Sequence, residues 1–433
     1  MRRTRLERDR ANRERDRATR ITDFMTNMFQ VLDPSEQRGN SVTAREILDK
    51  ASNDIKTGMA KDPDAQAQMM QVMGDVYDSL GLFSRARDLE QQSLDIRRRV
   101  LGPEHADTLN SMSDLADALN HDGHYAEAVK LNRETLEIRR HVLGPEHPDT
   151  LNSMNNLGDA LWADGRYAEA EKLDREALDL RRKVLRPEHP DTINSMNNLE
   201  VCLIYLGRYP EAEKLGRETL DLRRRVLGQE HPQTLNSMSN LAGVLSAERR
   251  LPESEKLNLE TLNLYRRLLG PENPQALRLM HNLAFVLSLE GRYAEAEKLD
   301  REALDLRRKV LGPEHPATLQ TMRDLGVDPS REGRYAEAEK LIRDTINLSG
   351  RILGTENQFT ASTVYCLGGI EARKGNRPMA LSLLRQALDT GLNPSDALEM
   401  ENDPDFRSLH SDPRFIAMVA DAKKGAAAAK TSE

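Results

Sequence analysis

Histidine is the side chain in this sequence most suited to chemistry, because it can bind metals and transfer protons near neutral pH. Five of the ten histidines stand in one recurring segment at multiples of 42 residues, His105, His147, His189, His231 and His315, and asparagine takes the two remaining places, Asn273 and Asn357. A metal needs several ligands about 2 Å from one ion. Stacked helices lie about 8–10 Å apart, so these histidines form a ladder. We predict a structural role for them, packing against or capping the next helix.

Glutamates of the recurring Tyr-Ala-Glu-Ala-Glu-Lys-Leu-Asp-Arg-Glu segment are the other candidates for acid–base chemistry. In the copy that begins at Tyr167, Lys172 and Arg175 lie at helical spacing from the carboxylates, which predicts a solvated, ion-paired helix face. The sequence contains neither a GxxxxGK[ST] nor a GxGxxG phosphate loop, and neither a GxSxG nor an HExxH motif. It therefore predicts no enzyme activity, no cofactor and no metal site.

The elements that carry these residues are pairs of helices. In the repeat that begins at Leu143, Thr150 is the expected N-cap of a first helix, helix A, which ends at the Asp164-Gly165 turn. Helix B is expected from about Tyr167 to Val184, and a glycine such as Gly144 closes the helix B before it. Each repeat is then an antiparallel helix hairpin that buries its apolar face only by stacking on its neighbours.

Small and large residues alternate on the expected inward faces of this hairpin, and Gly158 allows the two helices to approach closely. The expected core residues are Leu157, Leu161, Tyr167, Ala170, Leu173, Ala177 and Leu178. Clear repeats begin near Leu101, Leu143, Leu185, Leu227, Leu269 and Leu311, with a weaker one at Leu353 and a degenerate first repeat over Asp64–Leu80 and Phe83–Val100.

Two repeats depart from the pattern. Arg249-Arg250-Leu251 replaces the Gly-x-Tyr turn of the fourth clear repeat. In the sixth, Pro329 stands where Leu161 stands in the second. Proline removes a helical hydrogen bond and costs about 3 kcal/mol in a regular helix, so the sequence predicts a shortened or kinked helix over Leu325–Ser330.

The flanks divide the chain into four predicted parts. Residues 1–63 form a charged N-terminal helix and a helical cap, with helices over Ile21–Leu32 and Ser41–Met59. Residues 64–390 form the array, residues 391–423 a C-terminal helical cap, and residues 424–433 a disordered tail. Within residues 1–20, nine arginines alternate with four acids, a pattern typical of a solvated charged helix rather than an RNA-binding arm.

Composition bounds the class of protein. Hydrophobic residues make up 38% of the 433 residues, aromatic residues only 4% and charged residues 31%, which suits a helical array with thin core layers. The net charge of −8, with both signs mixed, does not indicate nucleic-acid binding. We find no run of about 18 apolar residues and only two cysteines. We expect a cytoplasmic protein with no membrane span in this chain and no nucleic-acid partner.

The pattern Leu-Gly-x-x-Leu, Tyr-x-x-Ala and a further Ala resembles the tetratricopeptide repeat. The 42-residue length and the phrase LGPEHPDTLNSMNNL resemble the kinesin-light-chain subtype of that family. The resemblance covers roughly residues 64–390. It implies an all-α fold, an α-solenoid in which helix hairpins form a right-handed superhelix, with helix A on the concave side.

A second resemblance concerns residues 17–52. This stretch is similar to the segment between the membrane span and the tetratricopeptide array of bacterial eukaryote-like serine/threonine kinases. It implies that the chain could be the detached sensor region of such a kinase. The kinase and the span themselves do not occur in these residues.

Helix A carries the predicted binding residues, because asparagine recurs on one of its faces and offers both a donor and an acceptor to the backbone of an extended peptide. Trp162, the single tryptophan, is either an anchor for that peptide or a packing residue against the next repeat. Basic residues enter only in the fifth and sixth repeats. The predicted groove residues are Asn110, Asn152, Asn155, Asp159, Trp162, Asn194, Asn197, Asn236, Arg278, His281 and Arg323.

The sequence thus favours a non-catalytic scaffold that binds an extended peptide or a partner protein in a concave groove. Asparagines that merely solvate that face are the simpler alternative. A detached kinase sensor region, a kinesin-light-chain-like adaptor and a self-associating scaffold are the other functional alternatives.

Overall fold

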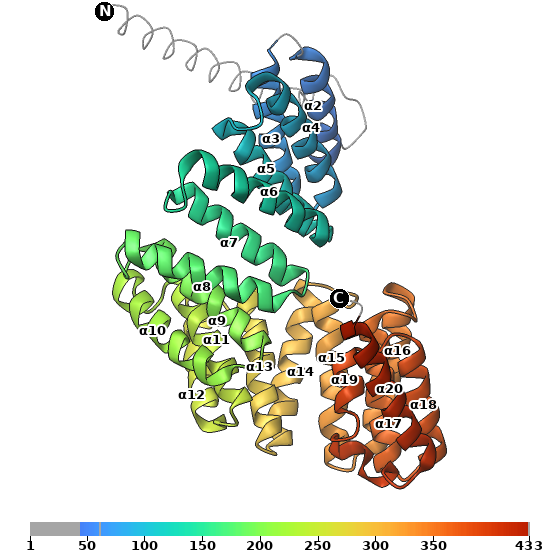
Figure 1. The fold of residues 1–433 in the computed structure, drawn as a ribbon. Coiled ribbons are helices and arrows are strands. Elements are labelled where there is room, and N and C mark those ends of the chain that lie inside the picture. Colours follow the sequence, from blue (N-terminus) through green and yellow to red (C-terminus); the bar gives the residue numbers. More distant parts are fainter. Residues whose placement is uncertain (1–43, 60–61, 432–433) are drawn as a thin grey trace, which may run out of the picture. The chain divides into compact units, whose positions relative to one another are not determined.

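The computed structural model describes residues 44–59 and 62–431 of the chain, and every regular element in them is helical (Figure 1). Helices follow one another as antiparallel hairpins, and each packs mainly on its neighbours in sequence. The all-α solenoid predicted from the sequence is confirmed. The predicted helix over Ile21–Leu32 and the charged segment 1–20 lie outside the described residues. Two compact units divide the chain, one that ends at Leu222 and one that begins at Arg223.

The N-terminal unit contains α2 (Ala44–Gly58) and the first four hairpins, whose helices we call A and B in chain order. Its A helices are α3 (Pro63–Ser79), α5 (Ala106–His121), α7 (Pro148–Ala163) and α9 (Pro190–Tyr205). Its B helices are α4 (Phe83–Leu101), α6 (Tyr125–Leu143) and α8 (Tyr167–Val184), and α10 (Tyr209–Leu227) begins in it. The bounds predicted for the helix B of the second clear repeat are therefore confirmed, and those predicted for the degenerate first repeat differ from the structure by at most one residue.

The C-terminal unit continues the same alternation. Its A helices are α11 (Pro232–Ala247), α13 (Pro274–Leu289), α15 (Pro316–Arg331) and α17 (Gln358–Arg373). Its B helices are α12 (Leu251–Leu269), α14 (Tyr293–Val310), α16 (Tyr335–Ile352) and α18 (Arg377–Asp389). The short α19 (Pro394–Glu399), the 3-10 turn η1 (Pro404–Leu409) and α20 (Pro413–Thr431) follow.

The N-cap of each helix A is the recurring histidine and not the predicted threonine. Helix α7 begins at Pro148, and the Nδ1 atom of His147 accepts a hydrogen bond from the amide of Asp149 at 3.2 Å. Asn273 makes the same cap through Oδ1 at 2.9 Å. The hydroxyl of Thr150 lies one turn inside the helix and donates to the carbonyl of Gly144 at 2.8 Å. The histidine ladder therefore satisfies orphan amides at the helix starts.

Two irregular repeats keep the regular fold. Arg249 takes the left-handed conformation (φ 62°) that glycine takes at Gly165 (φ 79°), so the turn is retained at a steric cost. The shortening predicted at Pro329 is wrong, because α15 runs through to Arg331. Proline lies in the last turn, and its carbonyl still accepts the amide of Arg334 at 2.8 Å in the closing turn.

The C-terminal segment covers the last hairpin. Phe406, Leu409 and Phe415 are buried in one cluster with residues of α17 and α18. Helix α20 is longer than predicted and includes the alanine run up to Thr431. Alanine has the highest helix propensity of the residues, so the helix continues where the sequence analysis placed a disordered tail.

Helix A and helix B of one hairpin meet where a small residue faces a polar one. A Cβ atom at Gly158 would lie 2.5 Å from Oδ1 of Asp174. In the next hairpin the roles are exchanged, since a Cβ at Gly216 in helix B would lie 2.5 Å from Oε1 of Glu200 in helix A. Each of these two hairpins thus contains a complementary small–polar pair at the contact between helix A and helix B.

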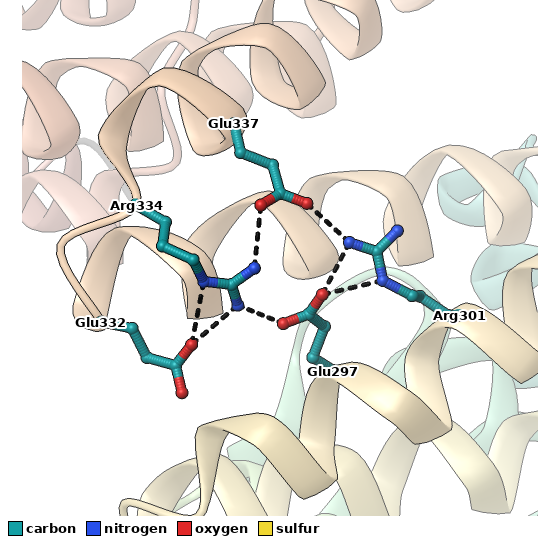
Figure 2. Close-up of polar contacts among 5 residues, drawn as sticks. All are labelled: Glu297, Arg301, Glu332, Arg334 and Glu337. Atoms are coloured by element: carbon teal, nitrogen blue, oxygen red, sulfur yellow. Dashed lines mark hydrogen bonds and ion pairs between the residues drawn. The ribbon is translucent and has the colours of Figure 1, made fainter.

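The B helices are linked to one another by ion pairs on their exposed side, as predicted for the Tyr-Ala-Glu-Ala-Glu segment. Arg334, at the start of α16, contacts Glu332, Glu337 and, from the preceding helix B, Glu297 (Figure 2). Arg301 of α14 completes the network with an ion pair to Glu337 at 2.6 Å. Exposed pairs contribute little individually, but this network recurs and keeps the carboxylates engaged in the fold.

No helix in the part of the chain that the structure describes is both long enough and apolar enough to cross a membrane.

The capping role of the histidines is testable by substitution. We expect His147→Ala to lower the free energy of unfolding by about 1 kcal/mol, because an orphan amide loses its acceptor. His147→Asn should stay within a few tenths of wild type, since Asn273 and Asn357 already cap their helices in this way. Urea unfolding followed by the fluorescence of Trp162, which lies in the same helix, measures both. Equal losses for the two variants would contradict the capping role.

Candidate peptide-binding face

The A helices form the candidate site, because they line one side of each unit. Successive A helices contact one another in the N-terminal unit, α3 with α5, α5 with α7 and α7 with α9. Direct hydrogen bonds cross between them, from Asn198 to Asp159 at 2.9 Å and from Ser195 to Asn155 at 3.3 Å. In the C-terminal unit α11 contacts α13, and α15 contacts α17. We call the exposed side of these helices the A-helix face.

All predicted groove residues lie on A helices, but the structure places them in two separately described units. The N-terminal unit holds Asn110, Asn152, Asn155, Asp159, Trp162, Asn194 and Asn197. The C-terminal unit holds Asn236, Arg278, His281 and Arg323. Within each unit the residues stand at matching positions of successive A helices.

A buried arginine from each of several B helices determines what the asparagines can do. Arg181 of α8 is 2% exposed. Its guanidinium donates to Oδ1 of Asn152 in its own hairpin at 2.8 Å and to Oγ of Ser195 in the next hairpin at 2.7 Å. Arg139 makes the same bonds to Asn110 and Ser153. We call this three-helix contact the arginine link.

The arginine link recurs with its partners. Arg97 and Arg223 donate to Ser111 and Ser237, and Arg307 donates to Thr321. In the fourth clear repeat tyrosine replaces the linking arginine, and the hydroxyl of this residue, Tyr265, donates to Oδ1 of Asn236 at 3.2 Å. In the hairpin that follows, Leu279 replaces the serine or threonine that accepts from arginine in the other repeats. Arginine in a helix B thus occurs with serine or threonine in the next helix A, whereas tyrosine occurs with leucine. This correlation between repeats is a sequence signal for the link that was not recognised from the sequence.

The arginine link changes the interpretation of the asparagine ladder. Each acceptor oxygen of Asn110 and Asn152 already takes one hydrogen bond from arginine. The side chains are nevertheless exposed. They offer a ligand their amide donors, which suit backbone carbonyl groups of an extended chain.

Trp162 packs against the next repeat, the second of the two roles considered from the sequence. Its ring meets that of Tyr205 edge to face at 5.2 Å, and Tyr205 stacks on Tyr167 at 5.0 Å. Trp162 is only partly exposed, whereas Tyr205 is 54% exposed. The exposed aromatic surface on this part of the A-helix face is therefore Tyr205, with Trp162 behind it.

The basic positions of the C-terminal unit differ in their availability. Arg278 is exposed, with a hydrogen bond to Gln275 at 3.0 Å. Arg323 lies over the ring of Phe359 at 5.2 Å and pairs with Asp324. Burial lowers the pKa of His281, although the nearby Asp324 carboxylate opposes this effect. We infer that Arg278 is the basic residue most open to a ligand.

Phe285 is a further residue of the C-terminal A-helix face that the sequence analysis missed. It is 57% exposed and borders a pocket of about 120 Å³ between α13 and α15, lined also by His281, Ser288, Val327 and Arg331. Alignment of the repeats could have shown it, because Phe285 stands where Asp159 stands three repeats earlier.

Carboxylates gather on the A-helix face of the N-terminal unit. Enclosure by the surrounding helices raises the pKa of Asp114, Asp117 and Asp159 to about 6 in each case. Neighbouring carboxylates also raise these pKa values, since Asp75 raises the pKa of Asp114 and Asp117 raises the pKa of Asp159. These side chains are therefore close enough to repel one another at neutral pH.

Two fully buried carboxyl groups lie beneath them. Glu90 of α4 is 2% exposed, contacts the backbone of Gly74 in α3, and neither of its oxygens has a hydrogen-bond partner in the described part of the chain. Burial raises its pKa to about 9, with Asp114, Asp75 and Asp78 adding to the shift and Arg97 opposing it. Asp174 is 1% exposed, and burial raises its pKa to about 7.

Among the described residues, no group of three or more histidine, cysteine or acidic side chains is arranged to hold a metal. Cys366 keeps its proton, because burial raises the pKa of its thiol to about 11. The face is an extended polar surface with isolated aromatic side chains, which suits binding.

Stacked hairpins of this kind define a class of protein, the helical-repeat scaffolds. The tetratricopeptide repeat model matches residues 66–141, 107–183, 149–225, 201–267, 233–309 and 275–349, so that its matches run from residue 66 to residue 349. The chain belongs to the tetratricopeptide repeat family.

Two solved structures with TM-scores above 0.5 agree with this fold. The apo quorum sensor NprR of B. thuringiensis is 12% identical over 87% of this chain and 99% of its own, with a TM-score of 0.56. Apo RapI is 11% identical over 65% of this chain and 97% of its own, with a TM-score of 0.52. TPR-like repeats of a kinesin light chain from Podosopora anserina are 28% identical over 48% of this chain and 98% of their own, with a TM-score of 0.43. A search of the curated proteins gave no match.

The arginine link predicts a coupled pair of substitutions. Arg181→Tyr alone should lower the free energy of unfolding by about 3 kcal/mol, because Ser195 is left buried without its donor. Adding Ser195→Leu reproduces the pair found at Tyr265 and Leu279 and should recover most of the loss. Urea unfolding, followed by Trp162 fluorescence, measures the free energy of unfolding of Arg181→Tyr, of Ser195→Leu and of the double variant. Strict additivity of the two changes would contradict the link.

The buried carboxyl of Glu90 predicts a pH dependence. Its folded pKa of about 9 exceeds the ordinary value of 4.5, so the folded state holds a proton that the unfolded chain releases between these values. Stability is therefore full below about pH 4.5 and declines as the pH rises towards 9. Glu90→Gln should match wild type at pH 5 and exceed its unfolding free energy by about 1–3 kcal/mol at pH 8. Identical pH profiles in Trp162-monitored urea unfolding would contradict the prediction.

Proposed function

We propose that this chain is a non-catalytic scaffold that binds partner proteins through extended segments lying across its A-helix face. The observation that carries the proposal is the pair of exposed aromatic side chains on that face, Tyr205 in the N-terminal unit and Phe285 in the C-terminal unit. Aromatic residues form only 4% of the chain, and leaving these two rings 54% and 57% exposed costs hydrophobic free energy. Exposed aromatics of this kind are typical anchors of protein interfaces.

The surroundings of the two rings suit an extended segment. On the A-helix face of the N-terminal unit, Asn110 and Asn152 are exposed near the starts of α5 and α7, and their positions are fixed by the arginine link. Around Phe285, the adjoining pocket combines apolar and charged side chains, including Val327 and Arg331. Within the N-terminal unit a segment could place backbone carbonyls on the asparagine donors, and within the C-terminal unit a segment could place an apolar side chain beside Phe285. The exposed groove residues predicted from the sequence, such as Asn110, Asn152 and Arg278, keep a binding role in the proposal.

Two further functions considered from the sequence are not favoured by any feature described above. The sensor-region alternative rests on residues 17–52, ahead of the first family match at residue 66. Self-association is separable from partner binding by measuring the mass of the purified chain as its concentration is raised.

Photocrosslinking tests where a partner binds. A photoreactive phenylalanine analogue replaces Tyr205 or Phe285 on A helices, and Tyr125 or Leu259 on B helices as matched controls with 40% and 39% exposure. We expect ultraviolet light to capture the same partner from native lysate at one or both A-helix positions and at neither control. Capture only at the B-helix positions would overturn the proposal, and so would capture of nothing but further copies of this chain.

A further inference from the structure

We propose that the A-helix face of the N-terminal unit is a docking surface for a lysine- or arginine-rich extended segment of a partner protein. The inference deepens the proposed function, on which it rests, by naming the chemistry of one partner. It starts from the charge of the A helices. Helices α3, α5, α7 and α9 together contain ten acidic residues and neither lysine nor arginine.

The acids are ordered in a row. Asp75, Asp117 and Asp159 occupy the same position of three successive A helices, and all three are exposed. Asp78 and Asp114 flank this acidic row. Of the side chains on these helices, the imidazole of His121 lies 2.7 Å from Asp78. The arginines nearest the row, Arg97, Arg139 and Arg181, are buried in the arginine link, and Arg97 and Arg139 offset only part of the rise in the pKa of Asp114.

A second observation points to a cation. Glu90 reaches from α4 across the hairpin to the backbone of Gly74, next to Asp75, and both of its oxygens lack a hydrogen-bond partner among the described residues. Asp174 likewise contacts Gly158, next to Asp159, and its Oδ1 has no hydrogen-bond partner there. Glu90 keeps its proton at neutral pH because burial raises its pKa to about 9, and the pKa of Asp174 is raised to about 7, so a cation on the face would favour the ionised forms of both. The same cation would stabilise the exposed row together with them.

Spacing selects an extended segment over a metal ion. Neighbouring helices lie roughly 10 Å apart, so the three carboxylates of the row cannot converge on one ion, whereas an extended chain rises about 3.3 Å per residue. A basic residue at every third position would therefore meet one aspartate per hairpin. The arginine-rich segment 1–20 of this chain has the same charge sign, but its four acids interrupt this spacing. We therefore commit to a segment supplied by a partner.

Binding to a synthetic probe tests the proposal on the full chain. The probe is a fluorescent twelve-residue peptide, four repeats of Lys-Ser-Ser, with Glu-Ser-Ser as its control, and the readout is fluorescence anisotropy. The test variant is Asp75→Asn, Asp117→Asn, Asp159→Asn. The matched control is Asp95→Asn, Glu137→Gln, Asp179→Asn, which removes three exposed acids from the B helices of the same three hairpins.

We expect the lysine peptide to bind wild type and the control equally, and the test variant roughly tenfold more weakly or worse. Affinity should fall as salt rises. It should also fall from pH 7.5 to pH 5, as Asp117, beside Asp78 and His121, and Asp159, beside Asp117, take up protons. Equal losses in both variants, or no loss in the test variant, would overturn the docking surface.

Two further arms separate the remaining outcomes. A full chain with the nine arginines of residues 1–20 changed to glutamine reports on the chain's own segment. If only the glutamine variant binds the peptide, the chain's own segment 1–20 occupies the acidic row, and the proposal of a segment from a partner is wrong. If a partner crosslinks at Tyr205 but the test variant captures it equally well, the acidic-row inference fails while the proposed function stands. If the peptide binds at the row and no partner crosslinks at either aromatic, the proposed function fails instead.

Discussion

A guanidinium group cannot be buried without hydrogen-bond acceptors on several sides, and this constraint determines how the repeats of the array meet. Isolated buried charges are very costly, so Arg139 and Arg181 need an acceptor in their own hairpin and another in the next. The first fixes the pairing of helix A with helix B, and the second fixes the register of one hairpin on its neighbour. The regular exposure of the A-helix face follows from this register. In the fourth clear repeat Tyr265 replaces the charged arginine and Leu279 replaces the serine hydroxyl, so the contact there is largely apolar.

The sequence predicted the features that depend on local chemistry and periodicity. The hairpin bounds, such as Tyr167–Val184 for α8, follow from apolar spacing and glycine turns. It did not predict contacts between residues distant in sequence. Arg181 and Arg182 are adjacent, and from the sequence both are expected at the surface. The packing shows that Arg181 is buried, whereas Arg182 forms an ion pair with Glu218 on the outside at 2.9 Å. The acceptor on Asn152 could not be assigned to that arginine for the same reason.

Local rules also failed where two of them competed. Thr150 and His147 are both able to cap a helix, and threonine is the commoner choice. Pro148 decides between them, because proline is favoured in the first turn of a helix, where its missing amide is not needed. Pro329 shows the converse error. Pro329 cannot donate a backbone hydrogen bond, yet α15 continues to Arg331, and the closing turn keeps the bond from the Arg334 amide to the Pro329 carbonyl. One missing bond therefore does not end this helix.

The distribution of differences among the repeats argues that binding depends on the A helices. Helices α8 and α14 have the same eighteen-residue sequence, and both serve the ion-paired side of the array. Their partner A helices, α7 and α13, differ at the exposed position, where Asp159 is replaced by Phe285. Structural requirements alone do not explain this contrast, because an exposed position in a helix tolerates many residues, and neither a repelling row of carboxylates nor a solvated phenyl ring stabilises the fold. Both are costs that a ligand can offset. The N-terminal unit has accumulated negative charge on this face and the C-terminal unit aromatic and basic groups, so the two units should select segments of different chemistry from one repeating framework.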